Sequence, residues 1–129
     1  MKTMLLLITL LFVVHCYGQN KTVPTIGAEQ YHLSETLLKE WKKDATGCLN
    51  LRCKYIDTLQ NNRHLVGMPL QQFLTLFGKP SEATNGYFYT YLVCTKCDAS
   101  LRRDKGYDSA WMVFCFEKGN LVRMIMQLQ

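Results

Sequence analysis

The residues of this chain with the most distinctive chemistry are its cysteines. The sequence has 129 residues and six cysteines, five of which follow residue 18: Cys48, Cys53, Cys94, Cys97 and Cys115. Four thiolates at C-x4-C and C-x2-C spacings can close a tetrahedron around zinc. A C-x2-C pair can also form a thiol–disulfide redox site. In an oxidising compartment the five residues would instead form at most two disulfides, with one cysteine left over.

Disulfides are the interpretation that the surrounding sequence favours. A redox pair normally opens a helix, whose N-terminus lowers the pKa of the first thiol, whereas Cys94 follows a strand pattern and Cys97 enters a charged loop. A long link from the N-terminal half would stabilise the fold by roughly 3–4 kcal/mol. We therefore predict the disulfides Cys48–Cys97 and, across the sheet, Cys94–Cys115. A zinc or redox site at Cys94 and Cys97 is the alternative.

The N-terminal segment predicts an exported protein. Residues 1–18 carry a positive Lys2, then an apolar run up to Val14 and a short polar end, which is the pattern of a cleaved signal peptide. The apolar run of about eleven residues is too short to span a bilayer as a helix. Residues 19–30 show no periodicity and predict an extended leader. We expect a secreted or periplasmic protein.

Cys16 adds an alternative location. Bacterial lipoproteins are cut immediately before a cysteine that receives the acyl chains, and Cys16 lies at the end of the apolar run. His15, however, stands where such a signal requires a small residue. Lipidation at Cys16 would make the chain an outer-membrane lipoprotein and is its one predicted route to a membrane.

Other residue types give no catalytic arrangement. His32 and His64 each stand alone in the sequence, and a lone histidine is usually a surface or structural residue. The sequence contains no G-x-S-x-G, H-E-x-x-H or phosphate-binding loop. Its net charge of +5 is spread along the chain without a basic stripe, which argues against nucleic-acid binding. We expect a protein that is not an enzyme and has no cofactor.

Helical periodicity dominates the first half of the domain, which we place at residues 31–129. An apolar stripe from Leu33 to Trp41 predicts a helix that Ser34 caps. A weaker stripe predicts a second helix within residues 48–62. These two segments supply apolar faces that must pack against another layer.

The next segments complete the predicted architecture. Pro69 and Gly78 bracket a short third helix, because proline suits a first helical turn and glycine suits the residue after the last. Three segments then alternate with period two and predict strands: Tyr87 to Val93, Ala110 to Phe116 and Leu121 to Leu128. The fold class is therefore α+β, with two to three N-terminal helices packed on a three-stranded antiparallel sheet.

The last two strands predict which side chains form the core. With Phe116 opposite Leu121, strict alternation gives one wholly apolar face, which we expect to be the core face: Trp111, Val113, Cys115, Val122, Met124 and Met126. The opposite face is also more apolar than a solvent face normally is: Met112, Phe114, Phe116, Leu121, Arg123 and Ile125. The leader, a loop or a partner should then cover it.

The strand at residues 87–93 carries three alternating tyrosines, which are candidates for contact with a partner: Tyr87, Tyr89 and Tyr91. If they share an uncovered face with Phe114 and Phe116, they form a broad aromatic platform beside Arg123. If they point to the core, they are strand formers only.

The segment from Leu65 to Pro80, which reads LVGMPLQQFLTLFGKP, resembles the signature of the SmpA/OmlA family of bacterial outer-membrane lipoproteins and the similar β-lactamase-inhibitor-protein domains. In these families G-M opens a short helix that ends in G-x-P, and strands follow. The resemblance covers about residues 63–128, while residues 31–60 are longer than the family needs. It implies a sheet packed on helices, no catalytic residues, and a protein partner bound by contact. We therefore expect an exported interaction domain of the cell envelope or extracellular space that binds its partner through the sheet.

Overall fold

Helices and strands occupy separate stretches of the chain. A computed structural model describes residues 27–95 and 109–129. Three α-helices come first: α1 (Glu35–Lys43), α2 (Ile56–Gln60) and α3 (Leu70–Phe77). Short 3₁₀ turns accompany them: η1 (Glu29–Tyr31), η2 (Cys53–Tyr55) and η3 (Arg63–Leu65). The predicted α+β class is confirmed.

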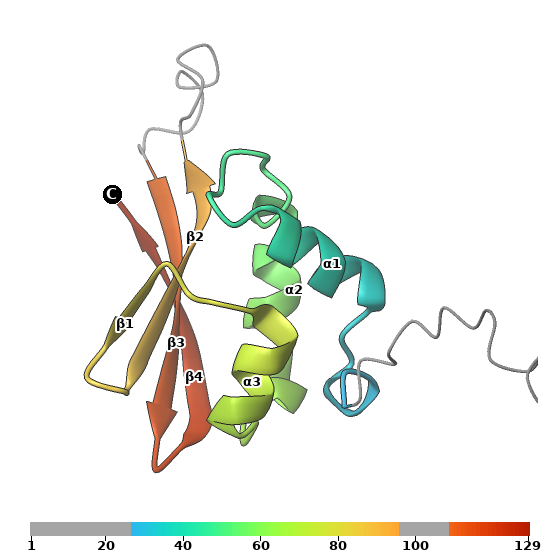
Figure 1. The fold of residues 1–129 in the computed structure, drawn as a ribbon, viewed down its shortest axis with the longest axis vertical. Coiled ribbons are helices and arrows are strands. Elements are labelled where there is room, and N and C mark those ends of the chain that lie inside the picture. The colour runs from blue at the N-terminus through green and yellow to red at the C-terminus, as the bar shows by residue number, and fades with distance from the viewer. Residues whose placement is uncertain (1–26, 96–108) are drawn as a thin grey trace, which may run out of the picture.

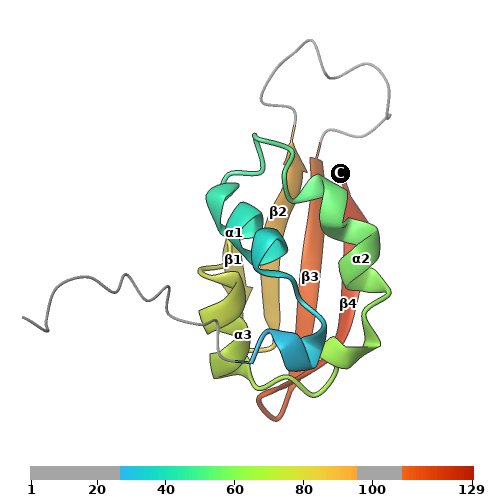
Figure 2. The same cartoon turned by 90° about the vertical axis from the view of Figure 1, so that its right-hand side faces the viewer.

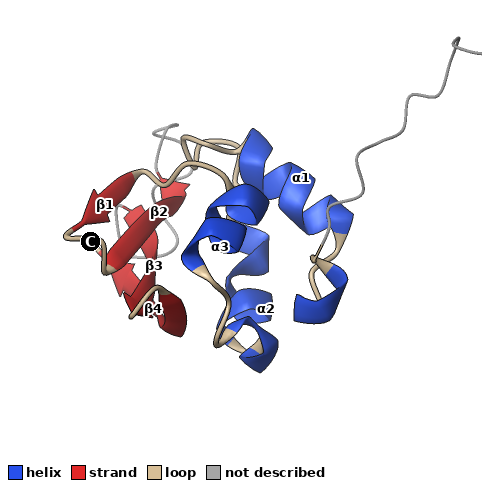
Figure 3. Ribbon diagram, turned by 60° about the horizontal axis from the view of Figure 1, so that its bottom comes forward, coloured by secondary structure: helices blue, strands red, loops and turns tan. Residues whose placement is uncertain are grey.

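Four strands form one antiparallel sheet in the order β1-β2-β3-β4: β1 (Glu82–Thr84), β2 (Phe88–Thr95), β3 (Ser109–Glu117) and β4 (Asn120–Leu128). The predicted three strands were one too few, because β1 has only three residues, all exposed, and shows no alternation. All three helices lie on one side of the sheet (Figure 1) and cover that face (Figure 2). The result is two layers, separated in the view of Figure 3.

Helices α1 and α3 form where local signals predict them. Ser34 caps α1, and its Oγ accepts a hydrogen bond of 3.1 Å from the backbone N–H of Leu37. Helix α3 begins after Pro69 and ends before Gly78, whose φ of +79° favours glycine. Both boundaries follow from side-chain chemistry within one turn of the helix end.

The second helix is shorter than predicted, and its first part is a loop. Asp44 is fully buried, and its carboxylate accepts hydrogen bonds from the backbone N–H groups of Leu49, Leu51 and Arg52. These bonds satisfy three backbone N–H groups of this segment without a helix. Helical structure resumes at η2, and only Ile56–Gln60 is α-helical.

A β-bulge in β4 reverses the predicted core face of β3. Phe116 pairs with Leu121 as predicted, but Cys115 pairs with Arg123, so Val122 is an extra residue. The side chains that face the helices are therefore Met112, Phe114, Phe116, Leu121, Met124 and Met126. The prediction that Trp111, Val113 and Cys115 lie in the core was wrong, because one inserted residue changes which face each later pair occupies.

The core lies between the helices and the covered face of the sheet. Trp41 of α1 is fully buried, and its ring centroid lies 5.7 Å from that of Phe77, 5.6 Å from Tyr91 and 6.3 Å from Phe114. Phe73 of α3 stacks at 4.7 Å on Phe77. This aromatic cluster fixes α1 and α3 on the sheet.

Candidate binding groove on the open sheet face

The face of the sheet opposite the helices is the candidate site, and we call it the open face. No helix of the described residues covers it (Figure 1). Side chains from all four strands line a groove of about 390 Å³ there: Glu82, Thr84, Phe88, Thr90, Trp111, Val113, Cys115, Ile125, Gln127 and Gln129. That volume lies within the range of small-ligand and anchor pockets.

Strand β3 forms the floor of this groove. Val113 and Cys115 are only 6% and 4% exposed, although no helix lies over them. Val113 has Thr90 on β2 and Ile125 on β4 as its cross-strand neighbours, and Cys115 has Phe88. The neighbouring side chains therefore rise around the two floor residues, and the face is concave rather than flat.

Among the described residues that line the groove, Trp111 has a buried polar atom without a hydrogen-bond partner. Its indole Nε1 is buried and makes no hydrogen bond within the described part of the chain. An unsatisfied buried N–H costs about 1–3 kcal/mol, so native structures usually provide an acceptor. A ligand that brings a carbonyl or carboxylate oxygen would supply it.

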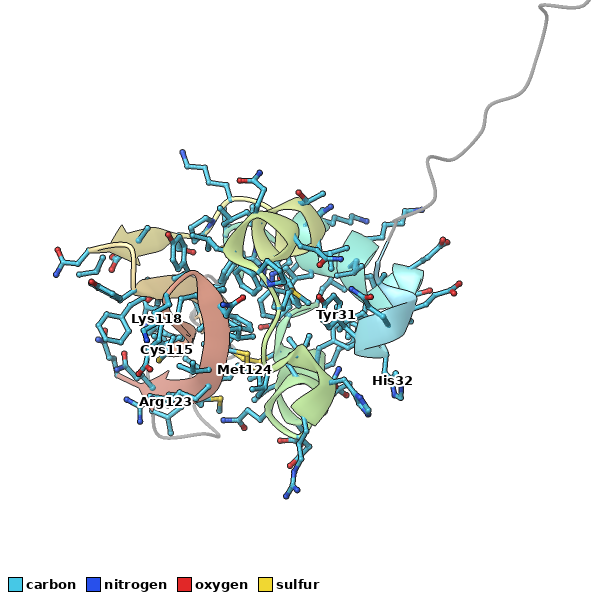
Figure 4. All side chains as sticks on the ribbon, turned by 90° about the horizontal axis from the view of Figure 1, so that it is seen from below. Tyr31, His32, Cys115, Lys118, Arg123 and Met124 are labelled. Carbon is cyan, nitrogen blue, oxygen red and sulfur yellow. A yellow bond between two sulfur atoms is a disulfide. The ribbon has the colours of Figure 1, made fainter. Side chains whose placement is uncertain are left out.

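The two rims of the open face carry opposite charges. Glu82 on β1 and Arg123 on β4 are both exposed, at opposite edges of the sheet. Arg123 lies opposite Cys115 in the register, and Figure 4 shows both on one side of β4, with Met124 directed toward the helices. Phe88 adds an aromatic ring that is 41% exposed. The site thus combines an apolar centre with a polarity that would orient a ligand across the strands.

Four of the six partner-binding residues predicted from the sequence lie in the core instead. Tyr89, Tyr91, Phe114 and Phe116 share one face, as one alternative required, but the helices cover it. The Tyr91 hydroxyl donates a hydrogen bond of 2.6 Å to the carbonyl of Gly78, and burial raises the pKa of this phenol. The aromatic platform is therefore not a surface.

The other two predicted contact residues remain accessible. Tyr87, which directly precedes β2, is 55% exposed, and Arg123 is exposed on the open face. Sequence reasoning missed the residues that line the groove, Trp111, Val113 and Cys115, because it assigned them to the core. Only the bulge distinguishes the two assignments.

The disulfide of Cys94 differs from the prediction. Cys94 bonds Cys53, with the two Cα atoms 5.3 Å apart, and Cys115 is a free, buried cysteine. Cys94 lies opposite Ala110 in the sheet and Cys115 opposite Phe88, so the predicted pair is separated by five β3 positions, or roughly 17 Å. That distance is far beyond the reach of a disulfide.

A second bulge explains why Cys94 meets the helical layer. The register of β2 and β3 shifts between Leu92 and Cys94, so Val93 and Cys94 both belong to the core cluster. Cys94 therefore points toward η2, which carries Cys53. The shift removes Cys94 from the face that contains Cys115.

Other predicted features lie partly or wholly outside the described residues. Cys48 is disulfide-bonded, while Cys97, its predicted partner, belongs to the undescribed segment. The predicted signal peptide, Cys16 and most of the predicted leader are also outside. The described end of that leader is not extended, since Ala28 is buried and η1 follows.

Two further observations concern metals and membranes. Among residues 27–95 and 109–129, no group of three or more His, Cys, Asp or Glu side chains could hold a metal ion. No helix in these ranges is long and apolar enough to cross a membrane.

The two histidines, which we expected to be isolated, nevertheless stack on each other at 3.8 Å between ring centroids.

Comparisons with protein-family models, with curated proteins and with solved structures found no match for this chain. The choice of the open face as the candidate site therefore rests on its geometry alone.

Proposed function

We propose that this chain is an exported, non-enzymatic interaction domain that binds a protein partner in the groove of its open face. The observation that carries the proposal is the uncovered apolar floor, where Val113 and Cys115 are nearly inaccessible and the indole N–H of Trp111 has no acceptor. Apolar residues on an uncovered, concave sheet face are typical of a surface that another molecule covers. Tryptophan is among the residues that contribute most to such interfaces.

A peptide segment suits this groove better than a purely apolar ligand. Its side chains can fill the space over Val113, while a backbone carbonyl can accept the hydrogen bond that Trp111 offers. Charged residues at its two ends can pair with Glu82 and Arg123 across the strands. A hydrocarbon chain would leave the indole N–H and both charges unused.

The proposed location and family relationship agree with this role. The disulfide between Cys53 and Cys94 is typical of proteins in oxidising compartments, which supports a secreted or periplasmic location. The resemblance of residues 63–128 to the SmpA/OmlA family adds support, because those domains act by contact. In this proposal Cys16 would add a lipid anchor only if the chain is an outer-membrane lipoprotein.

Site-specific photo-crosslinking in the native host tests the proposal. A photoreactive residue is introduced at Phe88 or Gln127, on the rim of the groove, and at Lys39, an exposed position of α1. We expect one discrete adduct from the two rim positions and none from Lys39. Equal cross-linking from all three positions would contradict the proposal.

Binding measurements with the captured partner make the test quantitative. Ile125→Glu should weaken binding at least tenfold, because it places a charge in the groove, whereas Lys39→Glu should leave the dissociation constant unchanged. Trp111→Phe keeps most of the ring but removes the N–H donor, so a several-fold loss would locate the acceptor. If Ile125→Glu binds as tightly as wild type, the open face is not the interface.

A further inference from the structure

The stacked histidines lie at a separate place, on the helical layer. His32 follows η1 and His64 lies within η3, and their ring planes are inclined by 26° at a centroid distance of 3.8 Å. Both residues are exposed. Figure 4 shows His32 projecting outward from the helical layer, far from Cys115 and Arg123. The pair is therefore independent of the groove.

One asparagine fixes the two backbones that carry these rings. The Asn62 amide nitrogen donates a hydrogen bond of 2.7 Å to the carbonyl of Tyr31, directly before His32. The Asn62 carbonyl oxygen accepts a hydrogen bond of 3.1 Å from the backbone N–H of His64. The side chain of Asn62 thus fixes the backbones that carry the two histidines relative to each other.

Buried leucines anchor both segments from below. Leu33 follows His32 and is 5% exposed, while Leu65 follows His64 and is fully buried. Each histidine therefore projects into solvent from a backbone that the core holds in place. The pairing belongs to the folded structure and not to two independent surface side chains.

The backbone of His32 is in a conformation that most residues avoid. Its φ is +54° and its ψ is +40°, and its N–H donates to the carbonyl of Glu29 to close η1. Glycine would adopt this left-handed conformation at lower energy, since a residue with a Cβ atom loses roughly 1–2 kcal/mol there.

We propose that His32 and His64 together form a surface site for a divalent transition-metal ion of the Zn²⁺ and Cu²⁺ type. Neutral imidazole nitrogens are preferred ligands of these ions. Two nitrogens that bind one ion at about 2.0–2.1 Å lie about 3 Å apart, and the centroid distance of 3.8 Å shows that the two rings are close enough for their nitrogens to reach one ion after side-chain rotation. The lone pairs lie in the ring planes, which are inclined by only 26° in the stack, so both side chains must rotate before the lone pairs converge on one ion. Both residues are exposed, which leaves room for that rotation.

Two protein ligands define the chemistry of this site. No third carboxylate, thiol or imidazole of the described residues completes it, so water or a group from another molecule fills the other positions. The site should bind ions in the order of their preference for imidazole, with Cu²⁺ tighter than Zn²⁺ and Zn²⁺ tighter than Mn²⁺. Ca²⁺ and Mg²⁺, which require oxygen ligands, should not bind.

Titration of the purified chain with Zn²⁺ alone, followed by calorimetry, tests this inference. We expect one equivalent to bind, and at least a tenfold loss of affinity in both His32→Asn and His64→Asn. Asparagine is chosen at residue 32 because it tolerates the left-handed backbone, so the fold should be retained. Thermal unfolding without metal provides that control. If either single variant binds Zn²⁺ like the wild type, the proposal is wrong.

Electron paramagnetic resonance with Cu²⁺ gives a second readout that does not depend on affinity. Two imidazoles should produce hyperfine structure from two equivalent nitrogens, and each single variant should lose it. A spectrum that is the same in both variants would assign the ion to the amino terminus or another group and overturn the pair. Asn62→Ala should weaken binding while it leaves both imidazoles present, because it releases the two backbones.

Discussion

The two faces of the sheet are built from similar side chains but have different neighbours. The covered face presents Met112, Phe114 and Phe116 to the helical layer, and all three side chains are buried there. The open face presents Trp111, Val113 and Cys115 from the same strand, and they line a groove. Because consecutive residues of β3 alternate between a core and a candidate binding surface, a one-residue change in register would exchange the two.

The helical layer is also attached to the sheet by polar contacts that the open face lacks. Arg52 is only 2% exposed, and its guanidinium donates hydrogen bonds to the carbonyls of Trp41 at 2.8 Å and Leu92 at 3.1 Å. It also lies 5.1 Å from the centroid of the Trp41 ring and 5.3 Å from that of Tyr91. The covered face thus has a buried charge with several hydrogen-bond partners at Arg52. A buried indole N–H without an acceptor occurs on both sides of the sheet, at Trp41 in the core and at Trp111 on the open face.

The largest expected effect is a difference in stability between alanine substitutions at two adjacent residues of β3, Phe114 and Val113. Phe114→Ala removes a fully buried ring beside Trp41 and Phe73 and should lower the free energy of unfolding by about 3–5 kcal/mol. Val113→Ala, on the open face, should cost about 1–2 kcal/mol, because fewer buried atoms are lost. Urea denaturation measures both. Equal losses would mean that the open face is covered as completely as the core.

The next comparison is between the Cys53–Cys94 disulfide, which lies on the covered side of the sheet, and the free thiol of Cys115 on the open face. Replacing both Cys53 and Cys94 with alanine opens a link between residues 41 positions apart and should cost roughly 4 kcal/mol. Cys115→Ala should cost about 1 kcal/mol, because it removes one thiol from the groove floor. Thermal unfolding of the two variants under non-reducing conditions compares them. A loss from Cys115→Ala as large as that of the double variant would contradict the free thiol at Cys115.

Arg52 provides a contrast between a buried and an exposed charge. Arg52→Met leaves the carbonyls of Trp41, Ala45 and Leu92 without their donor and should cost about 2–3 kcal/mol. Burial lowers the pKa of the Arg52 guanidinium, which agrees with a desolvated charge. Arg123→Met, on the exposed rim, should change stability by less than about 0.5 kcal/mol. Chemical denaturation of the pair tests this, and similar losses would show that hydrogen bonding of Arg52 adds little.

Local signals made part of this architecture predictable. Ser34, Pro69 and Gly78 act through contacts within one helical turn, and the ends of α1 and α3 follow from them. The Phe116–Leu121 pair was also predicted, and the tight turn at Lys118 and Gly119 brings these two residues opposite each other.

Other features depend on contacts between distant segments and left no local signal. The bulges at Val93 and Val122 lie in strands with apolar side chains on both faces as well as polar ones, so alternation alone did not reveal an inserted residue. The first part of the helix predicted within residues 48–62 is a loop, because the carboxylate of the buried Asp44 accepts hydrogen bonds from the N–H groups of Leu49, Leu51 and Arg52. The pairing of His32 with His64 depends on Asn62 and on two anchors in the core. The bulge at Val122 and the pairing of the histidines determine the two candidate sites, which is why the fold class was easier to predict than the sites.

The smallest expected effect tests how completely the covered face is desolvated. Because burial raises the pKa of Tyr91 in the folded protein, the folded state favours the neutral phenol. The resulting stability is fully present below the pKa of about 10 that an unfolded tyrosine has, and it is lost as the pH rises from there toward the folded value. The unfolding free energy should therefore fall above pH 10, by at most about 1.4 kcal/mol per pH unit for this group.

Tyr91→Phe isolates the contribution of Tyr91 to this alkaline decline. The variant loses the hydrogen bond to Gly78 and should be about 1 kcal/mol less stable at neutral pH. It should also have a shallower decline between pH 10 and pH 11.5, because no phenol at residue 91 remains to ionise. Urea denaturation over this range measures both slopes. If they are identical, water reaches Tyr91 in the folded protein, and the contrast between a sealed covered face and an accessible open face does not hold at this position.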